Sequence, residues 1–268
     1  MMKRVPWLGI IAFAILLAVI SPLIVIIPTS LTSANFLAFP PEGISLRWYE
    51  KILDRPEFID AFYYSLRLAL LTAVAATVAG TIAALAIHKF RFPGRQLINA
   101  LLLSPLTVPA IIIGIAALVF FTRIGIAGTF RGLLLAHILI SIPYVVRLVL
   151  TGLSSYDYTL ERAAYMLGAS SWQVFRDITL PLLRPAVISG FIFSFLTSFD
   201  NVTVSLFLVT PTSTTLPLAI FNYMQEILDP LVASISSVVI LLSVVFIFLL
   251  EKVYGLDRLF GVNTQSHS

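Results

Sequence analysis

Few residues of this chain have the types and spacing that a chemical site requires. The 268 residues include no cysteine, and the three histidines, His88, His137 and His267, lie far apart, so no metal-binding cluster is predicted. His137 and Ser141 lie four residues apart, but no further member of a catalytic dyad or proton relay accompanies them, and a polar contact between helices explains them better. The sequence therefore predicts no catalytic residue, no metal and no enzymatic activity.

The residues that bind nucleotide phosphates are also missing. The sequence contains no Gly-x-x-x-x-Gly-Lys segment, and none of its four lysines follows a glycine. This is the loop whose backbone amides cradle phosphates in many ATPases. No cofactor of the chain's own is expected, and if its function consumes ATP, a partner must bind the ATP–Mg.

The composition indicates an integral membrane protein. Hydrophobic residues make up 59% of the chain and charged residues only 11%, and the mean hydropathy is +1.01, whereas a soluble globular protein has roughly a quarter charged residues. This balance excludes soluble enzymes and nucleic-acid-binding proteins. The net charge of +4 is typical of basic cytoplasmic loops and indicates no nucleic-acid partner.

The apolar residues form six stretches long enough to cross a lipid bilayer. A hydrocarbon core about 30 Å thick requires roughly 20 residues, and a helix satisfies the backbone hydrogen bonds that lipid cannot. The predicted spans cover approximately residues 8–28, 65–87, 97–121, 132–153, 186–209 and 231–250. Pro105 and Pro109 are expected to kink the third span. The first span is too long for a secretory signal and lacks a cleavage site, so we interpret it as a retained anchor.

The predicted fold is therefore an all-α membrane protein with six transmembrane helices, in which residues 1–268 form one domain. The distribution of Lys and Arg predicts its orientation, because cytoplasmic loops are enriched in these residues. With the amino terminus inside, ten basic residues lie in cytoplasmic segments: Lys3, Arg4, Lys89, Arg91, Arg95, Arg162, Arg176, Arg184, Lys252 and Arg258. Five lie outside: Arg47, Lys51, Arg55, Arg123 and Arg131. Both termini are predicted to be cytoplasmic, and segment 154–185 becomes an intracellular loop.

The intracellular loop has the pattern of two short helices. Leu160, Ala163, Ala164 and Leu167 fall on one apolar face at helical spacing. Gly168 is suited to the left-handed turn that ends a helix.

The second loop helix begins after that glycine. Ser170 and Gln173 have the spacing of a capping box. Its apolar side is predicted to carry Trp172, Phe175 and Ile178, and Pro181 is expected to end it. Periodicity leaves two interpretations open: a compact knob that fits a groove on a partner, or an amphipathic hairpin on the membrane surface.

The loop resembles the EAA loop in permease subunits of bacterial ABC importers, the inner-membrane components of binding-protein-dependent transport. That pattern is Glu-Ala-Ala, three residues, Gly, nine residues, Ile, one residue and Leu-Pro. The matching residues here are Ala163, Ala164, Gly168, Ile178, Leu180 and Pro181. The resemblance implies that the loop is a coupling helix that docks into a cleft on an ATP-hydrolysing subunit.

One position departs from this pattern. The glutamate of the pattern falls on Arg162, and the chain carries an acid one position earlier, at Glu161. Either Glu161 takes over the contact with the ATPase, or the ATPase presents an acidic residue to Arg162. A reversed charge at an interface affects the choice of partner more than the affinity.

Other segments resemble the spermidine/putrescine branch of these permeases. They are Pro143-Tyr144-Val145-Val146, Ser198-Phe199-Asp200, Thr214-Thr215-Leu216-Pro217 and Asp229-Pro230. The resemblance implies a multi-pass protein of the bacterial inner membrane that works with a second permease, two ATP-binding subunits and an extracytoplasmic solute-binding protein. It also implies a small-molecule substrate, a polyamine or a related amine or amino acid derivative.

Asp200 is the acid expected inside the membrane, about two-thirds of the way across the fifth span. A carboxylate in hydrocarbon is costly unless it faces water or a partner. Asp200 can line a substrate path, pair with a helix of the partner permease, or lie solvated near the outer interface. Asp200, Asn201 and Tyr144 are the candidates for the substrate path. The neutral Asn201, where many polyamine permeases carry a second acid, weakens the argument for a multiply charged amine.

The alternative function is that of a secondary transporter driven by an ion gradient. Such a protein would carry paired intramembrane carboxylates, or inverted repeats with broken helices in both halves. The sequence has neither, so the ATP-driven importer is the leading hypothesis.

Overall fold

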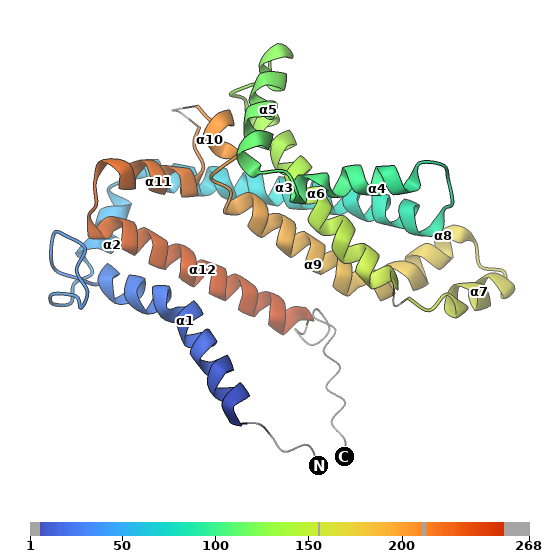
Figure 1. The fold of residues 1–268 in the computed structure, drawn as a ribbon, viewed down its shortest axis with the longest axis horizontal. Helices are drawn as coiled ribbons and strands as arrows, with labels where there is room; N and C mark the ends of the chain where they lie inside the picture. Colours follow the sequence, from blue (N-terminus) through green and yellow to red (C-terminus); the bar gives the residue numbers. More distant parts are fainter. Residues whose placement is uncertain (1–5, 155, 211–212, 255–268) are drawn as a thin grey trace. The chain divides into compact units, whose positions relative to one another are not determined.

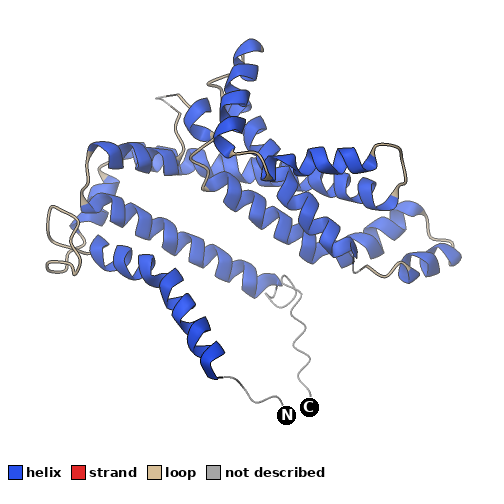
Figure 2. Ribbon diagram, viewed as in Figure 1, coloured by secondary structure: helices blue, strands red, loops and turns tan. Residues whose placement is uncertain are grey.

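The computed structural model describes residues 6–154, 156–210 and 213–254, and its regular elements are helices (Figure 2). Lys3, Arg4, Arg258 and His267 lie outside the described residues. The helices, labelled in Figure 1, are α1 (Pro6–Ser30), α2 (Arg47–Leu53), α3 (Pro56–Lys89), α4 (Arg95–Leu103), η1 (Ser104–Leu106), α5 (Ala110–Arg123), α6 (Phe130–Ser154), α7 (Thr159–Met166), α8 (Ser171–Val174), η2 (Phe175–Thr179), α9 (Leu180–Phe199), α10 (Ser205–Leu208), α11 (Leu216–Glu226) and α12 (Pro230–Tyr254).

Four helical segments in the described residues are long and apolar enough to cross a membrane. They are Gly9–Ser30, Pro56–Lys89, Phe130–Ser154 and Ser171–Phe199. A fifth forms if the bent pair Arg95–Leu106 and Ala110–Arg123 counts as one span, and Pro230–Val245 is a shorter apolar helix. The all-helical membrane fold is confirmed.

The third predicted span is broken rather than kinked. Helix α4 ends at Leu103 and is followed by the short η1, which ends at Leu106. Helix α5 starts at Ala110, and the chain is bent by 104° between the two parts. Pro109 precedes α5 and has an extended backbone (φ −54°, ψ 131°). Because proline lacks an amide hydrogen and pushes its preceding residue out of helical geometry, the chain turns here. Residues 104–110 therefore form a sharp elbow.

The fifth predicted span, 186–209, also has different bounds. The helix begins in the loop at Ser171 and runs through α8, η2 and α9 to Phe199. The prediction that Pro181 ends the second loop helix is wrong, because Pro181 lies in the first turn of α9. The preceding turn, η2, is a π-helix, whose wider hydrogen bonding accommodates a proline that would otherwise clash with the carbonyl four residues earlier.

The helices group into two compact units, Met1–Asp60 with Ala219–Leu249 and Ala61–Leu218 with Leu250–Ser268. In the first unit, hydroxyl groups join α1, α2 and α12. Ser234 of α12 donates a hydrogen bond to the carbonyl of Ser30 at the end of α1 (3.0 Å), and the Ser30 hydroxyl lies 2.6 Å from that of Tyr49 in α2.

In the second unit, α3, α6 and α9 approach closely around Val145. Helices α6 and α9 pack along each other (Figure 1). Val145 is fully buried in α6, between Gly80 of α3 and Gly190 of α9. A Cβ atom on Gly80 would lie 2.7 Å from Cβ of Val145, and one on Gly190 would lie 3.1 Å from its Cγ1. The two glycines therefore allow the close helix contacts that small residues provide in membrane proteins.

This packing predicts a position-dependent effect of adding one methyl group. Gly80→Ala should destabilise the detergent-solubilised protein by about 1–3 kcal/mol, because Val145 has no space to move. The thermal midpoint measured by size-exclusion chromatography reports the loss. Gly9→Ala in α1, where no atom lies within 4 Å of the added Cβ, is the matched control and should leave the midpoint unchanged or raise it. Equal midpoints for wild type and Gly80→Ala would contradict the packing.

Candidate functional site

The turn predicted at Gly168, in the loop between α6 and α9, is confirmed by its backbone. Helix α7 ends at Met166, and Gly168 has a φ of +85°, in the left-handed region. The amide of Ala169 donates to the carbonyl of Ala164 (3.0 Å), which is the hydrogen bond that closes a glycine-capped helix end. Ser170 and Gln173 form the predicted capping box at the start of α8. The two short elements are thus fixed by local chemistry.

The loop exposes a set of large apolar side chains. Leu160, Met166, Leu167 and Trp172 are 48%, 88%, 89% and 66% exposed. The apolar face predicted for the first helix is formed, and it is turned toward the solvent. In the second helix Trp172 lies beside Phe175, with ring centroids 5.7 Å apart, as expected for one apolar side, but Trp172 is exposed and the buried side chains there are Val174 and Thr179. This exposed apolar surface is available for a partner.

Glu161 is the buried centre of the loop. It is 7% exposed, and Lys89, the last residue of α3, lies 2.7 Å from its Oε1 and 3.0 Å from its Oε2. The hydroxyls of Tyr156 and Thr179 donate to the same Oε1 at 2.8 and 2.6 Å. One carboxylate therefore ties α7 to the end of α3 and to η2.

The electrostatics of this network keep the carboxylate ionised. Burial raises the pKa of Glu161, but hydrogen bonds from Lys89, Thr179 and Tyr156 and the charge of Lys89 outweigh it, and the pKa lies below its usual value. Because the folded pKa is the lower one, the stabilisation is complete above the unfolded pKa and is lost only as the pH falls through the folded value. Burial, together with the neighbouring Glu161, raises the pKa of Tyr156 to about 12, so its hydroxyl stays protonated and donates.

The network separates the two charged residues at the departure from the EAA pattern. Glu161 is directed into the chain, while its neighbour Arg162 is exposed. Ala163 is exposed, and Ala164, Ile178, Leu180 and Pro181 are partly exposed. Sequence reasoning missed the contacts of Lys89, Tyr156 and Thr179 with Glu161, because these contacts depend on how the loop packs on α3.

The candidates for the substrate path lie away from this loop. Asp200 follows the last residue of α9, about 30 Å along the helix from Leu180, so it lies at a helix end rather than within a span. It is exposed, and its carboxylate forms no hydrogen bond or ion pair within the described part of the chain. The side chain of Asn201 accepts a hydrogen bond from the amide of Val204 (2.8 Å). Tyr144 is partly exposed in α6, and within the described residues no hydrogen bond joins it to Asp200 or Asn201.

His137 holds the two sides of the turn at Asp200. The imidazole is fully buried in α6; its Nδ1 lies 2.8 Å from the hydroxyl of Ser198 in α9, and its Nε2 lies 3.1 Å from that of Ser205 in α10. The polar contact between helices predicted for His137 is confirmed, and its partners lie on α9 and α10. The turn that carries Asp200 and Asn201 is therefore held from both ends.

This arrangement of apolar helices and a loop between α6 and α9 can be compared with known proteins. The family model described as "Binding-protein-dependent transport system inner membrane component" matches residues 76–254. The chain belongs to this family. It is a permease subunit of an ABC importer, and thus a transport component of the bacterial inner membrane rather than a catalyst.

Individual relatives and a solved structure agree with this assignment. The permease is 33% identical over 226 residues to the spermidine/putrescine transport system permease protein PotC of Escherichia coli K12, which covers 84% of this chain and 85% of the relative. It is 31% identical over 244 residues to the putrescine transport system permease protein PotI of the same organism, covering 88% and 86%. A bacterial ABC transporter involved in the import of the acidic polysaccharide alginate has the same fold, with a TM-score of 0.71, 16% identity and coverage of 95% and 99%.

The Glu161 network predicts that one charge holds the loop in place. Glu161→Gln should weaken the docking of the loop by about 1–3 kcal/mol, because Lys89 loses its charged partner in a buried site. Since the chain has no cysteine, Val174→Cys provides a single buried reporter. Its labelling by a maleimide should accelerate by roughly ten-fold or more in the Glu161→Gln background.

The matched control is Asp177→Asn, which removes an exposed carboxylate of the same loop whose nearest cation, Arg176, is 3.8 Å away. This variant should label at the parent rate. If Glu161→Gln also labels at the parent rate, the ion pair does not hold the loop.

Proposed function

We propose that the loop 154–185 is the coupling loop on which an ATP-binding subunit docks. Two such subunits bind and hydrolyse ATP–Mg, and this chain forms the translocation path with a second permease. An extracytoplasmic solute-binding protein delivers the substrate. The observation that carries the proposal is the combination of a buried anchor, Glu161 with Lys89, and an exposed apolar surface on the same short helices.

The contact surface follows from this arrangement. Because Glu161 is occupied inside the chain, Arg162 is the charged residue that faces the ATPase, and we infer that the ATPase presents an acidic side chain to it. Ala163 and Ala164 have small side chains that allow a partner to approach the helix closely next to Gly168. Met166 and Leu167 provide apolar contact. Of the two alternatives for the charge reversal, this one fits the burial of Glu161.

The loop has two rigid connections to the membrane helices. Glu161 joins it to Lys89 at the end of α3, and the continuous helix from Ser171 to Phe199 joins it to the turn at Asp200. Movement of the ATPase subunits during closure is transmitted to α3 and α9 through these connections. Asp200, Asn201 and Tyr144 remain the proposed path residues.

The topology proposed for this function has six spans with both termini in the cytoplasm, and the whole chain acts as one permease domain. The bent pair α4–α5 and the apolar α12 complete the six. The excess of Lys and Arg in the segments assigned to the cytoplasm supports the orientation.

The proposed substrate is a polyamine or a related small amine or amino acid derivative. The names of the relatives PotC and PotI support a polyamine. The exposed, unpaired carboxylate of Asp200 provides a charge that attracts a cation. Because the chain belongs to the family of binding-protein-dependent permeases, we prefer the ATP-driven importer to the secondary transporter driven by an ion gradient.

The role of Gly168 can be tested by substitution. Gly168→Val should lower transport per ATP hydrolysed by about ten-fold, because a β-branched residue at a φ of +85° strains the turn by about 1–3 kcal/mol. Uptake and ATPase activity are measured together in liposomes that contain the full complex. Gly168→Asn, which tolerates the left-handed region, should retain most of the coupling.

The matched control is Gly94→Val. Gly94 has a φ of +80° and, like Gly168, no atom within 4 Å of an added Cβ, but it lies in the turn before α4. It carries the same strain outside the docking surface, so its ratio of transport to hydrolysis should remain normal. Normal coupling in Gly168→Val would refute the docking loop.

The role of Asp200 is tested by removing its charge. Asp200→Asn should raise the KM for uptake of a cationic substrate by about five-fold, which corresponds to about 1 kcal/mol for one exposed charge, and should leave the maximal rate similar. Asp54→Asn, which neutralises another exposed acid, is the control. Unchanged uptake in Asp200→Asn would remove Asp200 from the substrate path.

A further inference from the structure

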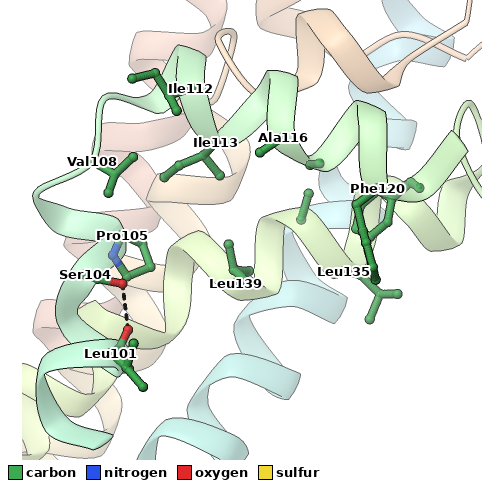
Figure 3. A pocket seen from close by; sticks show the side chains of 13 residues that line it. Leu101, Ser104, Pro105, Val108, Ile112, Ile113, Ala116, Phe120, Leu135 and Leu139 are labelled. Atoms are coloured by element: carbon green, nitrogen blue, oxygen red, sulfur yellow. Dashed lines mark hydrogen bonds between the residues drawn. The ribbon is translucent and has the colours of Figure 1, made fainter. Parts of the chain in front are cut away.

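An apolar groove lies at the elbow between α4 and α5. Figure 3 shows side chains from η1, α5 and α6 around it, among them Pro105, Ala116 and Leu139. The cavity measures about 560 Å³. Its one side-chain oxygen, the hydroxyl of Ser104, donates to the carbonyl of Leu101 (2.8 Å). Among the described residues, no other side chain that lines the groove carries a polar atom, so the groove suits a hydrocarbon chain.

A basic hollow lies at the other end of α4. Arg91 and Arg95 line it together with Gln96 and Leu97. The salt bridges found among the described residues include neither arginine, and the sequence has no Asp or Glu from residue 61 to residue 156. The neighbouring cation, Lys89, is already paired with Glu161. Two unpaired positive charges therefore remain at this turn.

Helix α4 connects the basic hollow to the apolar groove. Leu97 lines the hollow and Leu101 lines the groove, and residues four apart lie on the same face of a helix. The two leucines are 64% and 61% exposed. Nine residues of helix span about 13 Å, which is within the reach of one acyl chain.

We propose that this surface binds one anionic glycerophospholipid. Its phosphate pairs with Arg91 and Arg95, and an acyl chain runs over Leu97 and Leu101 into the groove at the elbow. The charge favours an anion and the groove favours hydrocarbon, a combination that an anionic lipid supplies and a soluble anion does not. Since Lys89 joins the same end of α3 to the coupling loop, the headgroup lies in the leaflet on the side of that loop.

The test uses the full transporter complex in nanodiscs of equimolar phosphatidylglycerol and phosphatidylcholine. After mild detergent extraction, mass spectrometry quantifies the phospholipids that stay bound. The wild type should retain phosphatidylglycerol in preference to phosphatidylcholine. The double variant Arg91→Gln/Arg95→Gln should lower this preference by about twenty-five-fold, since each arginine near an anionic headgroup contributes about a factor of five. Arg184→Gln removes another exposed arginine and should leave the preference unchanged.

A second pair of variants tests the groove. Ala116→Trp fills it from an exposed position and should abolish retention of both lipids, whereas Val119→Trp, exposed on the same helix but outside the groove, should not. Equal retention of the two lipids by the wild type, or an unchanged preference in the double arginine variant, would overturn the proposal. So would loss of the second permease in Ala116→Trp with lipid retention unchanged, because the groove would then be a contact between permeases. None of these readouts depends on transport.

Discussion

The buried ion pair between Glu161 and Lys89 is the interaction on which the loop between α6 and α9 depends. The loop holds the short elements α7 and α8; α8 begins the helix that continues to Phe199, but α7 is too short to be stable alone, because an isolated helix of less than about 12 residues is marginal in water. They also bury few apolar side chains, since Met166, Leu167 and Trp172 are exposed. The carboxylate of Glu161 holds them in place, because it accepts hydrogen bonds from Lys89, Tyr156 and Thr179. The exposed apolar side chains of the loop can remain uncovered because the Glu161–Lys89 ion pair on the buried side of α7 holds the loop in place.

The same region shows how a proline can be included in a long helix. The π-helical turn η2 lies just before Pro181 and lets the helix continue from the loop to Phe199. At the far end, His137 holds Ser198 and Ser205 on either side of the turn with Asp200. One continuous helix therefore connects the loop to the turn that carries Asp200, the residue proposed to meet the substrate.

Features set by neighbouring residues could be predicted from the sequence, and features set by packing could not. The left-handed Gly168 and the capping box of Ser170 depend on local chemistry, and they are confirmed. Of the six predicted spans, four are, within the described residues, helices long and apolar enough to cross a membrane, or five if the bent pair counts as one. The helix continuing past Pro181 was missed because a local rule for proline does not include a π turn. The burial of Glu161 was missed because its partner Lys89 is 72 residues away. The exposure of Trp172 could not be predicted, because periodicity identifies an apolar face without saying what covers it.

The ordered loop between α6 and α9 has a consequence for the proposed docking of an ATP-binding subunit. Ordering a flexible segment costs roughly 1–2 kcal/mol per residue in conformational entropy. Here the chain itself orders the loop through Glu161, so a docking subunit meets a surface that is already shaped and does not have to fold it. Assembly then resembles the meeting of two rigid bodies, with association governed by diffusion and charge rather than by a slow conformational search.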